Sequence, residues 1–307
     1  MRKIVFLDSD TLGTDVSLAP ISEHGELVTY PYTAPEEVFE RVKECDVLIV
    51  NKVYIGKQQI DAAPNLKLIC VAATGVNNVD LEYAASKEIP VRNVAGYSTE
   101  SVAQITFSLV LSLVSKVSYF NNAVKSGAYS NGPSFTDVTV PFWELKGKKY
   151  GIIGLGNIGK RVAEIATAFG LEVFYCPTSG VVHSDIYKAL YLDELLSTCD
   201  IVSIHAPLNE RTNNLLTYDK IKLMKPSSYL INLGRGGIIN EADLAQALND
   251  NLIAGAGVDV FVNEPLPKES PYLSINDKSK VILTPHIGWA SREARECLIS
   301  KLAANIY

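Results

Sequence analysis

Short apolar runs alternate with helix-like segments along the first third of the chain. The runs KIVFLD, DVLIVN and LKLICVAATG are separated by PEEVFERVKEC and IGKQQIDAAP, whose apolar residues recur at helical period. Residues 80–87 then resemble a helix and residues 90–94 a strand. Because alternating strands and helices are typical of parallel sheets, the pattern predicts a doubly wound α/β unit. A boundary is expected where Gly96 and Ser98 break the rhythm.

A long apolar helix is predicted next, over residues 100–125, with Ser98 or Thr99 as its cap. It is followed over residues 127–143 by an irregular stretch that contains Phe135, Phe142 and Trp143 and is expected to expose them. One interpretation is a loop that packs on its own domain. The other is an arm that reaches a partner subunit, since loose aromatic side chains beside an apolar helix are typical of dimer interfaces.

The remaining pattern predicts a second doubly wound parallel sheet. Strands are expected at LEVFYC, DIVSIHA, SSYLINL, AGAGVDVF and VILTPH, and helices over residues 192–198, 219–224 and 241–249. A last helical pattern covers residues 290–306, after a break at Pro285 and Gly288. This helix is expected to cross back to the first domain.

Composition narrows the kinds of partner. The 307 residues suffice for two domains with separate cores. The net charge of −6 includes no basic block, which argues against nucleic acid and anionic membranes and favours small molecules. The five cysteines are scattered without CxxC spacing, so neither disulfides nor a metal site is indicated. The first apolar run is too short for a signal peptide and no apolar span of about 18 residues occurs, which predicts a cytoplasmic protein.

The segment YGIIGLGNIG carries Gly154, Gly156 and Gly159 in GxGxxG spacing, between an apolar run and a helical pattern. In a strand-to-helix turn, such glycines permit a tight bend, a close approach of the backbone to a pyrophosphate, and close packing of helix on strand. The phosphates would lie on the unpaired N–H groups of the helix N-terminus. Methyltransferases and plain glycine-rich turns share the spacing, but the strand and helix on either side favour a dinucleotide site.

Polar residues gather at the ends of the later predicted strands, where open α/β sheets bind ligands. They are His205, Arg235, Asp259, Glu264 and His286. Each alone also fits an ordinary role, such as a loop histidine, a capping aspartate or a turn glutamate. Arg235 lies between glycines, on a turn that suits bidentate binding of a carboxylate. Together, a dinucleotide, an arginine and a histidine with a carboxylate beside it are the parts needed to pass a hydride to or from a 2-oxo acid.

The chain resembles the D-isomer-specific 2-hydroxyacid dehydrogenases over nearly its whole length. The resemblance rests on AATGVNNVDLEYAASKEIPV, STESVAQ, ELKGKKYGIIGLGNIGKRVA, HAPLNERTNNLL, MKPSSYLINLGRGGIINEADL, AGAGVDVFVNEPLP and LTPHIGWAS, in that order. It implies a Rossmann nucleotide-binding domain over residues 99–285, inserted into a flavodoxin-like substrate domain. That second domain would combine residues 1–98 with a returning helix over residues 286–307. The family also implies a homodimer joined through residues 100–143.

The same resemblance implies a catalytic set of Arg235, Glu264 and His286. Arg235 would bind the substrate, His286 would protonate its carbonyl oxygen and Glu264 would pair with His286. Asp259 would hold the nicotinamide carboxamide. Substrate contacts are expected from Lys52, Thr74, Gly75, Val76, Arg235 and Trp289. Expected cofactor contacts, besides the three glycines, are Asn157, Ile158, Cys176, Thr178, His205, Pro207, Thr212, Leu233, Gly234, Arg235, Asp259, His286 and Gly288.

Within the family, NKVYI around Lys52 and the ending HIGWASREAR look like the glycerate dehydrogenase or hydroxypyruvate reductase branch. The branch implies reduction of hydroxypyruvate or glyoxylate. Three alternatives remain: a short 3-phosphoglycerate dehydrogenase, another D-2-hydroxyacid dehydrogenase, and a non-catalytic NAD(H)-sensing protein on the same fold.

Two positions depart from the family pattern. Gln104 stands where a glutamate is common, which alters a structural hydrogen bond at most. Where an NAD enzyme usually ends its second strand with an acid, this chain has Cys176, and Thr178 and Ser179 follow. The hydroxyl groups could donate to a 2′-phosphate, but no arginine or lysine is expected nearby to balance the charge of the phosphate. The cofactor is therefore NAD or NADP, and the sequence slightly favours a site that accepts NADP.

Overall fold

The computed structural model describes residues 1–182 and 184–306. Contacts divide the chain into unit 1, which comprises residues 1–98 and the segment from residue 289 onward, and unit 2, which comprises residues 99–288. The second division lies beyond the one expected after Pro285, so His286, Ile287 and Gly288 belong to unit 2. The reason is local, because the backbone N–H groups of all three donate to Asp259 in unit 2. Tyr307, assigned by sequence to the last segment, lies outside the described residues.

Unit 1 contains a five-stranded parallel sheet in the order β2-β1-β3-β4-β5, the flavodoxin-like order. Its strands are β1 (Lys3–Phe6), β2 (Glu26–Thr29), β3 (Val47–Val50), β4 (Leu68–Val71) and β5 (Val91–Arg92). The central strands β3 and β4 are buried throughout, as their continuous apolar runs predict. Sequence patterning missed β2, an edge strand in which no residue is buried.

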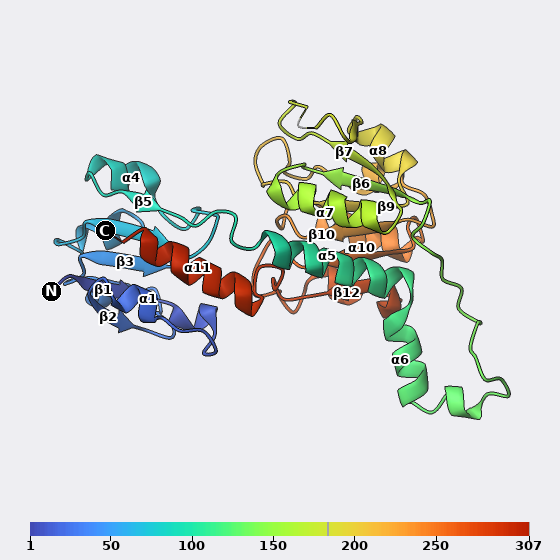
Figure 1. Cartoon of the computed structure of the whole chain (residues 1–307), viewed down its shortest axis with the longest axis horizontal. Helices are drawn as coiled ribbons and strands as arrows, with labels where there is room; N and C mark the ends of the chain where they lie inside the picture. Colours follow the sequence, from blue (N-terminus) through green and yellow to red (C-terminus); the bar gives the residue numbers. More distant parts are fainter. Residues whose placement is uncertain (183, 307) are drawn as a thin grey trace. The chain divides into compact units, whose positions relative to one another are not determined.

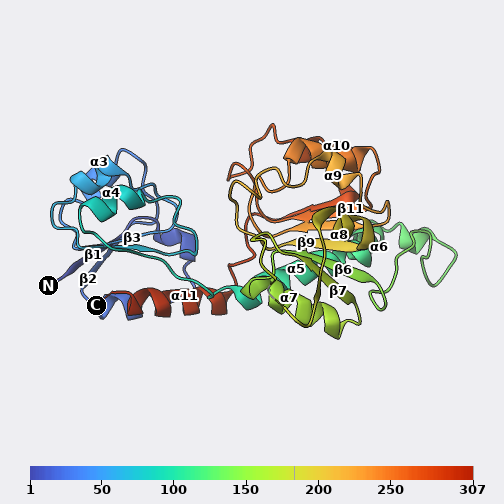
Figure 2. The ribbon, with the colours of Figure 1, turned by 90° about the horizontal axis from the view of Figure 1, so that it is seen from above.

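Helices cover both faces of this sheet (Figure 2). They are α1 (Ala19–Ser22), α2 (Val38–Arg41), α3 (Lys57–Asp61), α4 (Leu81–Ser86) and α11 (Arg292–Ala304), with a 3-10 turn η1 (Ser9–Leu12). Leu298 and Leu302 of α11 are fully buried in a cluster with Ile4 of β1. On the other face, Val38 of α2 and Ile60 of α3 pack with Val5. The C-terminal helix thus completes the core of the N-terminal unit.

Unit 2 contains a seven-stranded parallel sheet in the order β12-β11-β10-β9-β6-β7-β8. Its strands are β6 (Lys149–Ile153), β7 (Glu172–Cys176), β8 (Lys188–Ala189), β9 (Ile201–Ile204), β10 (Tyr229–Asn232), β11 (Gly255–Val258) and β12 (Val281–Leu283). The chain runs outward from β6 to β8 and then crosses to β9 on the other side of β6. The point between β6 and β9 is a topological switch, where a sheet of this kind binds its ligand.

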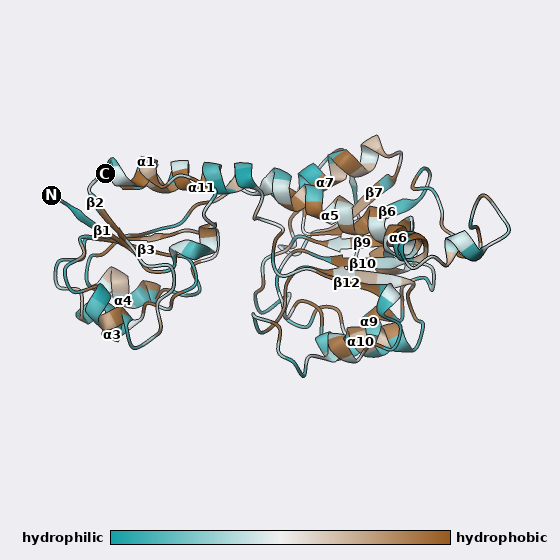
Figure 3. Ribbon diagram, turned by 90° about the horizontal axis from the view of Figure 1, so that it is seen from below, coloured by the Kyte–Doolittle hydropathy of each residue, from teal (hydrophilic) through white to brown (hydrophobic). Residues whose placement is uncertain are grey.

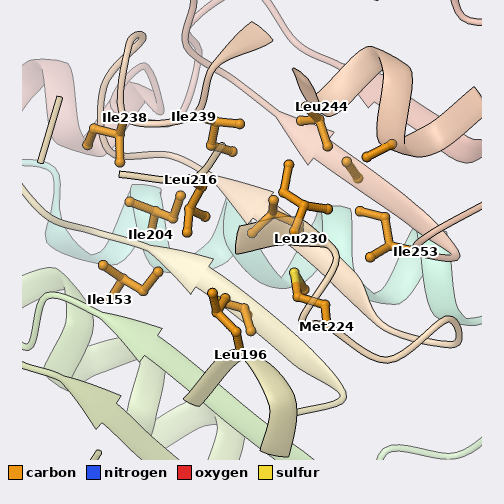
Figure 4. Packing of buried hydrophobic residues seen from close by; sticks show 14 of the residues in the cluster. Ile153, Leu196, Ile204, Leu216, Met224, Leu230, Ile238, Ile239, Leu244 and Ile253 are labelled. Atoms are coloured by element: carbon orange, nitrogen blue, oxygen red, sulfur yellow. The ribbon is translucent and has the colours of Figure 1, made fainter. Parts of the chain in front are cut away.

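Two layers of helices enclose this sheet, with α5 and α7 on one face and α9 and α10 on the other (Figures 1 and 2). The helices are α5 (Thr99–Val114), α6 (Val117–Lys125), α7 (Asn157–Ala168), α8 (Leu192–Thr198), α9 (Tyr218–Ile221) and α10 (Glu241–Asn249), with 3-10 turns η2 (Tyr129–Asn131), η3 (Pro271–Ser274) and η4 (Lys278–Lys280). Apolar and polar residues alternate around α7 and α10 (Figure 3). Leu196, Leu230 and Leu244 belong to one cluster of buried hydrophobic residues (Figure 4).

The predicted helix over residues 100–125 is two helices. Lys116 adopts a left-handed conformation with φ 53°, which interrupts the hydrogen-bond ladder between α5 and α6. The two axes meet at 62°, and the pair together, but no single described helix, has the length and apolar composition of a membrane span. Trp143 was expected to be exposed, but it is half-buried against Tyr229, with ring centroids 5.9 Å apart.

Candidate active site

The glycine-rich turn joins β6 to α7 at the switch point. Gly154 has φ 93°, which strongly favours glycine, and its N–H donates to the carbonyl oxygen of Cys176 at the end of β7. A Cβ on Gly159 would lie 2.2 Å from the carbonyl oxygen of Gly154, so helix and strand approach too closely for any side chain. A Cβ on Gly156 would meet no described atom within 4 Å. The turn therefore has no room for a side chain at Gly159, where helix packs on strand, and has free space at Gly156, where a ligand would approach.

A pocket of about 650 Å³ opens in front of this turn. The sequence-predicted residues that line it are Gly154, Gly156, Asn157, Thr178, His205 and Pro207. Since α7 is a twelve-residue helix capped by Gly156, its first N–H groups have no partner within the helix and face the pocket side with a partial positive charge. An open glycine cradle at a helix N-terminus fits a dinucleotide pyrophosphate.

His205 follows β9 and forms part of the pocket wall. Its Nε2 lies 3.0 Å from the hydroxyl of Ser203, while its buried Nδ1 has no hydrogen-bond partner among the described residues. Burial lowers the pKa of His205 to about 3, so the ring is neutral near pH 7. Thr212 is fully buried, and among the described residues its hydroxyl bonds only Pro207 and Asn209 of its own loop.

Arg235 lies on the turn after β10. The buried amide of Asn232 shapes this turn, donating to the carbonyl oxygen of Arg235 and accepting from the N–H of Gly234, both at 3.0 Å. A Cβ on Gly236 would lie 2.0 Å from the backbone of Phe261, so this turn packs tightly on the turn after β11. The exposed guanidinium of Arg235 makes one intramolecular hydrogen bond, from Nη1 to Gly234, and has no ion pair within the described part of the chain. Its other donors are available to a carboxylate.

Glu264 and His286 form a hydrogen-bonded pair beyond the ends of β11 and β12. The Nδ1 atom of His286 lies 2.7 Å from Oε2 of Glu264, and Oε1 of Glu264 accepts the N–H of Phe261 at 3.0 Å. Because an ionised carboxylate only accepts hydrogen bonds, Nδ1 carries a proton. The opposite nitrogen, Nε2, is left to donate to a substrate. The structure thus brings the predicted carboxylate and the predicted histidine within hydrogen-bond distance.

Asp259 fixes the loop that carries His286. This aspartate is 1% exposed, and its carboxylate accepts from the hydroxyl of Thr284 at 2.6 Å and from the N–H groups of Ile287 and Gly288 at 2.9 and 2.8 Å. Burial raises the pKa of Asp259, although these three hydrogen bonds act in the opposite direction. His286 itself has φ 53°, a strained conformation that the surrounding bonds maintain. Asp259 is thus firmly engaged within the protein.

The other candidates lie in unit 1, at the ends of adjacent strands. Lys52 follows β3, in a loop whose N–H groups at residues 51–53 all donate to the carboxylate of Asp8. Thr74, Gly75 and Val76 follow β4. The side chain of Asn78 donates to carbonyl oxygens of Asn51 and Val53, which ties the two loops together. Trp289 packs edge-on against Tyr97, with ring centroids 6.4 Å apart.

Several residues of these sites escaped sequence reasoning. Asp8 and Ser101 bond backbone groups far along the chain, and Ser101 donates to the carbonyl oxygen of Gly288 at 2.6 Å. Asn232 shapes the turn of Arg235 from within that turn. More important, the view that no basic residue stands near Thr178 is wrong. Arg211 and Lys160 line the same pocket, and Nη1 of Arg211 donates to the carbonyl oxygen of Ser179 at 3.2 Å.

Residues 107–288 match the family model for the NAD-binding domain of D-isomer-specific 2-hydroxyacid dehydrogenases. The chain belongs to this family. It is therefore an oxidoreductase that uses a nicotinamide cofactor. Glycerate dehydrogenase of Methylorubrum extorquens is 35% identical over 309 residues, covering 99% of this chain and 95% of the relative.

Two solved structures have the same fold. An acyclic imino acid reductase in complex with NADPH and D-Arg is 30% identical, with a TM-score of 0.86 over 99% of this chain and 95% of the other. D-Lactate dehydrogenase of Aquifex aeolicus, complexed with NAD and lactic acid, is 27% identical, with a TM-score of 0.83 over 99% of this chain and 94% of the other. The likeness confirms the predicted fold class of two parallel α/β domains, the second with a Rossmann fold. One of these structures contains NADPH and the other NAD, so the likeness does not decide which dinucleotide this chain prefers.

Proposed function

We propose that the protein reduces a small 2-oxo acid of the hydroxypyruvate or glyoxylate type to the D-2-hydroxy acid. The observation that carries the proposal is the placement of Arg235, Glu264 and His286 after β10, β11 and β12, three neighbouring parallel strands. Their carboxyl ends meet at one edge of the sheet, beside the switch point at which the nucleotide pocket opens. This edge of the sheet thus combines an arginine that can bind a carboxylate, a histidine that can donate a proton, and a glycine-rich turn that can hold a nucleotide.

Arg235 would bind the substrate through its carboxylate. A guanidinium forms two parallel charge-assisted bonds to a carboxylate, which orients the neighbouring carbonyl as well as holding the acid. Glycines on both sides of Arg235 keep the turn free of competing side chains. The N–H groups around Thr74, Gly75 and Val76, with Lys52, are proposed to bind the substrate from unit 1.

His286 would supply the proton. A bound nicotinamide supplies the hydride that reaches the carbonyl carbon. The carbonyl oxygen, which gains negative charge as the C=O bond is reduced, takes the proton from Nε2 of His286. Glu264 holds the ring through Nδ1 and stabilises the imidazolium before the transfer, as expected for a general acid with a carboxylate partner. Asp259, whose carboxylate already binds three groups of the His286 loop, would act mainly by positioning that loop, and a contact to the nicotinamide carboxamide would be additional.

A kinetic panel tests the proposal. Purified protein would be assayed with NADH and with NADPH against hydroxypyruvate, glyoxylate, pyruvate and 3-phosphohydroxypyruvate. Oxidation of cofactor with hydroxypyruvate or glyoxylate at the highest kcat/KM supports it, and a preference for 3-phosphohydroxypyruvate would favour a phosphoglycerate dehydrogenase. Tight binding of the dinucleotide without turnover of any acid would indicate that the protein senses the cofactor and is not an enzyme.

The α6 helix and the following arm are proposed to join two subunits. Every residue of α6 is half-buried or exposed, and Val124, Phe135 and Phe142 are exposed by 56%, 90% and 57%. The segment projects from the rest of unit 2 (Figure 1). Apolar side chains gathered on a projecting segment are typical of a subunit interface. Sedimentation of the wild-type protein and of a Phe135→Ser, Phe142→Ser variant tests this, with a dimer expected only for the former. The cytoplasmic location remains a prediction from sequence.

A further inference from the structure

The end of β7 carries polar groups without a negative charge. Cys176 closes the strand, and burial raises the pKa of its thiol, so it stays neutral near pH 7. Thr178 and Ser179 follow and line the nucleotide pocket. In dinucleotide-binding folds the residue at this place, about 20 residues beyond the glycines, faces the 2′ position of the adenosine ribose. A carboxylate there would bind the free hydroxyl of NADH and repel the phosphate of NADPH. This strand end lacks that selection against NADPH.

A positive charge reaches the same place from a distant segment. Arg211 lies in the loop after β9, where its own N–H donates to the side chain of Asn209 at 2.9 Å. Its guanidinium bonds the carbonyl oxygen of Ser179 at 3.2 Å through Nη1 only. Its remaining N–H donors are exposed, and it forms no ion pair with any carboxylate in residues 1–182 or 184–306. Arg211 is therefore held beside the loop after β7 with donors to spare.

The charges around the pocket favour an additional anion. Lys160 lies in the first turn of α7, close to where the pyrophosphate would lie, and Glu210 is the one carboxylate among the residues that line the described pocket. Lys160 and Arg211 are positively charged and Glu210 is negatively charged, so the pocket wall has a net positive charge. Since the α7 N-terminus and Lys160 would bind the pyrophosphate common to both dinucleotides, the charge of Arg211 is available to a group that only NADPH possesses.

We propose that Thr178, Ser179 and Arg211, here called the ribose corner, bind the 2′-phosphate and make this protein selective for NADPH over NADH. Arg211 would form charge-assisted bonds to the phosphate oxygens, and the two hydroxyls would donate further ones. The inference rests on the proposed dinucleotide site and adds which dinucleotide that site selects.

Binding measured without substrate tests the selectivity. Calorimetric titration of the full-length wild-type protein is expected to show at least about tenfold tighter binding of NADPH than of NADH. The smaller probes adenosine 2′,5′-bisphosphate and AMP isolate the 2′-phosphate, and the bisphosphate is expected to bind more tightly by a similar factor. Equal affinities, or tighter binding of NADH, would overturn the proposal.

Variants assign the selectivity to residues. Arg211→Gln should weaken binding of NADPH by about tenfold and leave that of NADH within about twofold. The matched control is Arg161→Gln, since Arg161 pairs with Glu100 and Glu164 on the surface of α7 and is absent from the pocket lining. It should change neither affinity. Equal losses of NADH and NADPH affinity in Arg211→Gln would overturn the assignment, because they would mean that Arg211 binds the shared pyrophosphate.

A second variant covers the case in which Arg211→Gln disturbs the loop. Ser179→Asp places a carboxylate in the loop after β7 and should weaken the binding of NADPH while leaving the binding of NADH unchanged or stronger. An unchanged preference would overturn the proposal. Failure of either nucleotide to bind the wild-type protein would overturn the dinucleotide site as well. If NADPH binds selectively but no 2-oxo acid is reduced, only the proposed reaction fails.

Discussion

The two units use the same device at the edges of their sheets. In unit 1 the buried carboxylate of Asp8, just after β1, binds three successive N–H groups of the loop after its neighbour β3. In unit 2 the buried carboxylate of Asp259, just after β11, binds two N–H groups and a hydroxyl of the loop after its neighbour β12. Each aspartate thereby fixes a loop that carries a candidate site residue, Lys52 in one case and His286 in the other.

The loops differ in what they offer. The unit 1 loops offer backbone N–H groups and one lysine, whereas the unit 2 loops offer an arginine, a histidine hydrogen-bonded to a carboxylate, and a glycine cradle. Unit 2 should therefore determine the rate of the chemical step and the affinity for cofactor. Unit 1 should affect mainly the affinity for the acid. The predictions below test this division, from the largest expected effect to the smallest.

The largest expected difference between the two units concerns His286 of unit 2. His286→Asn removes the proton donor while leaving a small polar side chain on the loop, so kcat for reduction should fall by about a hundredfold or more. NADPH affinity, measured by titration, should remain within about twofold. A kcat within tenfold of wild type would mean that another group delivers the proton.

Asp259→Asn should loosen the loop that carries His286 in unit 2 and thereby lower the rate of the reaction. An amide would place an NH₂ group against the N–H of Ile287 or of Gly288, which leaves a buried donor unpaired at about 1–3 kcal/mol. Displacement of His286 should then lower kcat by about tenfold or more. Stopped-flow and steady-state kinetics measure the loss. An undiminished kcat would show that the loop keeps its geometry without this carboxylate.

The glycine cradle has no counterpart in unit 1 and can be separated into packing and binding. Gly159→Ala places a methyl group 2.2 Å from the carbonyl oxygen of Gly154, so the free energy of unfolding should fall by about 1–3 kcal/mol. Gly156→Ala is the matched control, because its methyl group enters open space. It should change stability by less than about 1 kcal/mol yet weaken NADPH binding by about tenfold. Retained affinity in Gly156→Ala would mean that the backbone there does not approach the pyrophosphate.

Asp8→Asn makes in unit 1 the same exchange that Asp259→Asn makes in unit 2. The loop of Lys52 loses one good acceptor, so KM for the 2-oxo acid should rise several-fold, roughly the effect of 1 kcal/mol. The value of kcat and the NADPH affinity should change little. A loss of kcat as large as that of Asp259→Asn would contradict the division between the units.

The ring of His205 should affect the pH dependence of stability rather than the chemical step. Its pKa is lowered by burial to about 3, whereas an unfolded histidine titrates near 6.5. Between these values the unfolded chain binds a proton that the folded chain does not, so stability is lost as pH falls from about 6.5. In urea unfolding from about pH 7 to 4.5, His205→Gln should show a shallower decline, by about one proton. The exposed His24→Gln is the control, and identical slopes for His205→Gln and wild type would contradict the buried, neutral ring.

Sequence patterns predicted the central elements well. Helices α8 and α10 occupy the predicted residues, and the strands that end before His205, Arg235 and His286 are present, because parallel strands are short apolar runs even where, as in β12, they are half-buried. The half-exposed edge strand β2 and the break at Lys116 were missed. Both depend on solvent exposure or backbone strain that local patterns do not encode.

The candidate site was predictable where chemistry is concentrated in one segment. The glycines, Arg235 and His286 each stand in a distinctive local motif. Asp8 and Arg211 do not, because each acts on a loop that is remote in sequence and near only in the fold. An isolated aspartate or arginine in a polar segment carries no signal of such a contact.

Product analysis tests the central claim most directly. Wild-type protein, NADPH and hydroxypyruvate would be incubated to completion, and the glycerate formed would be quantified by chiral chromatography against the NADPH oxidised. The expected result is one molecule of D-glycerate for each NADPH consumed. L-Glycerate, a racemic product or oxidation of NADPH without glycerate would contradict the account.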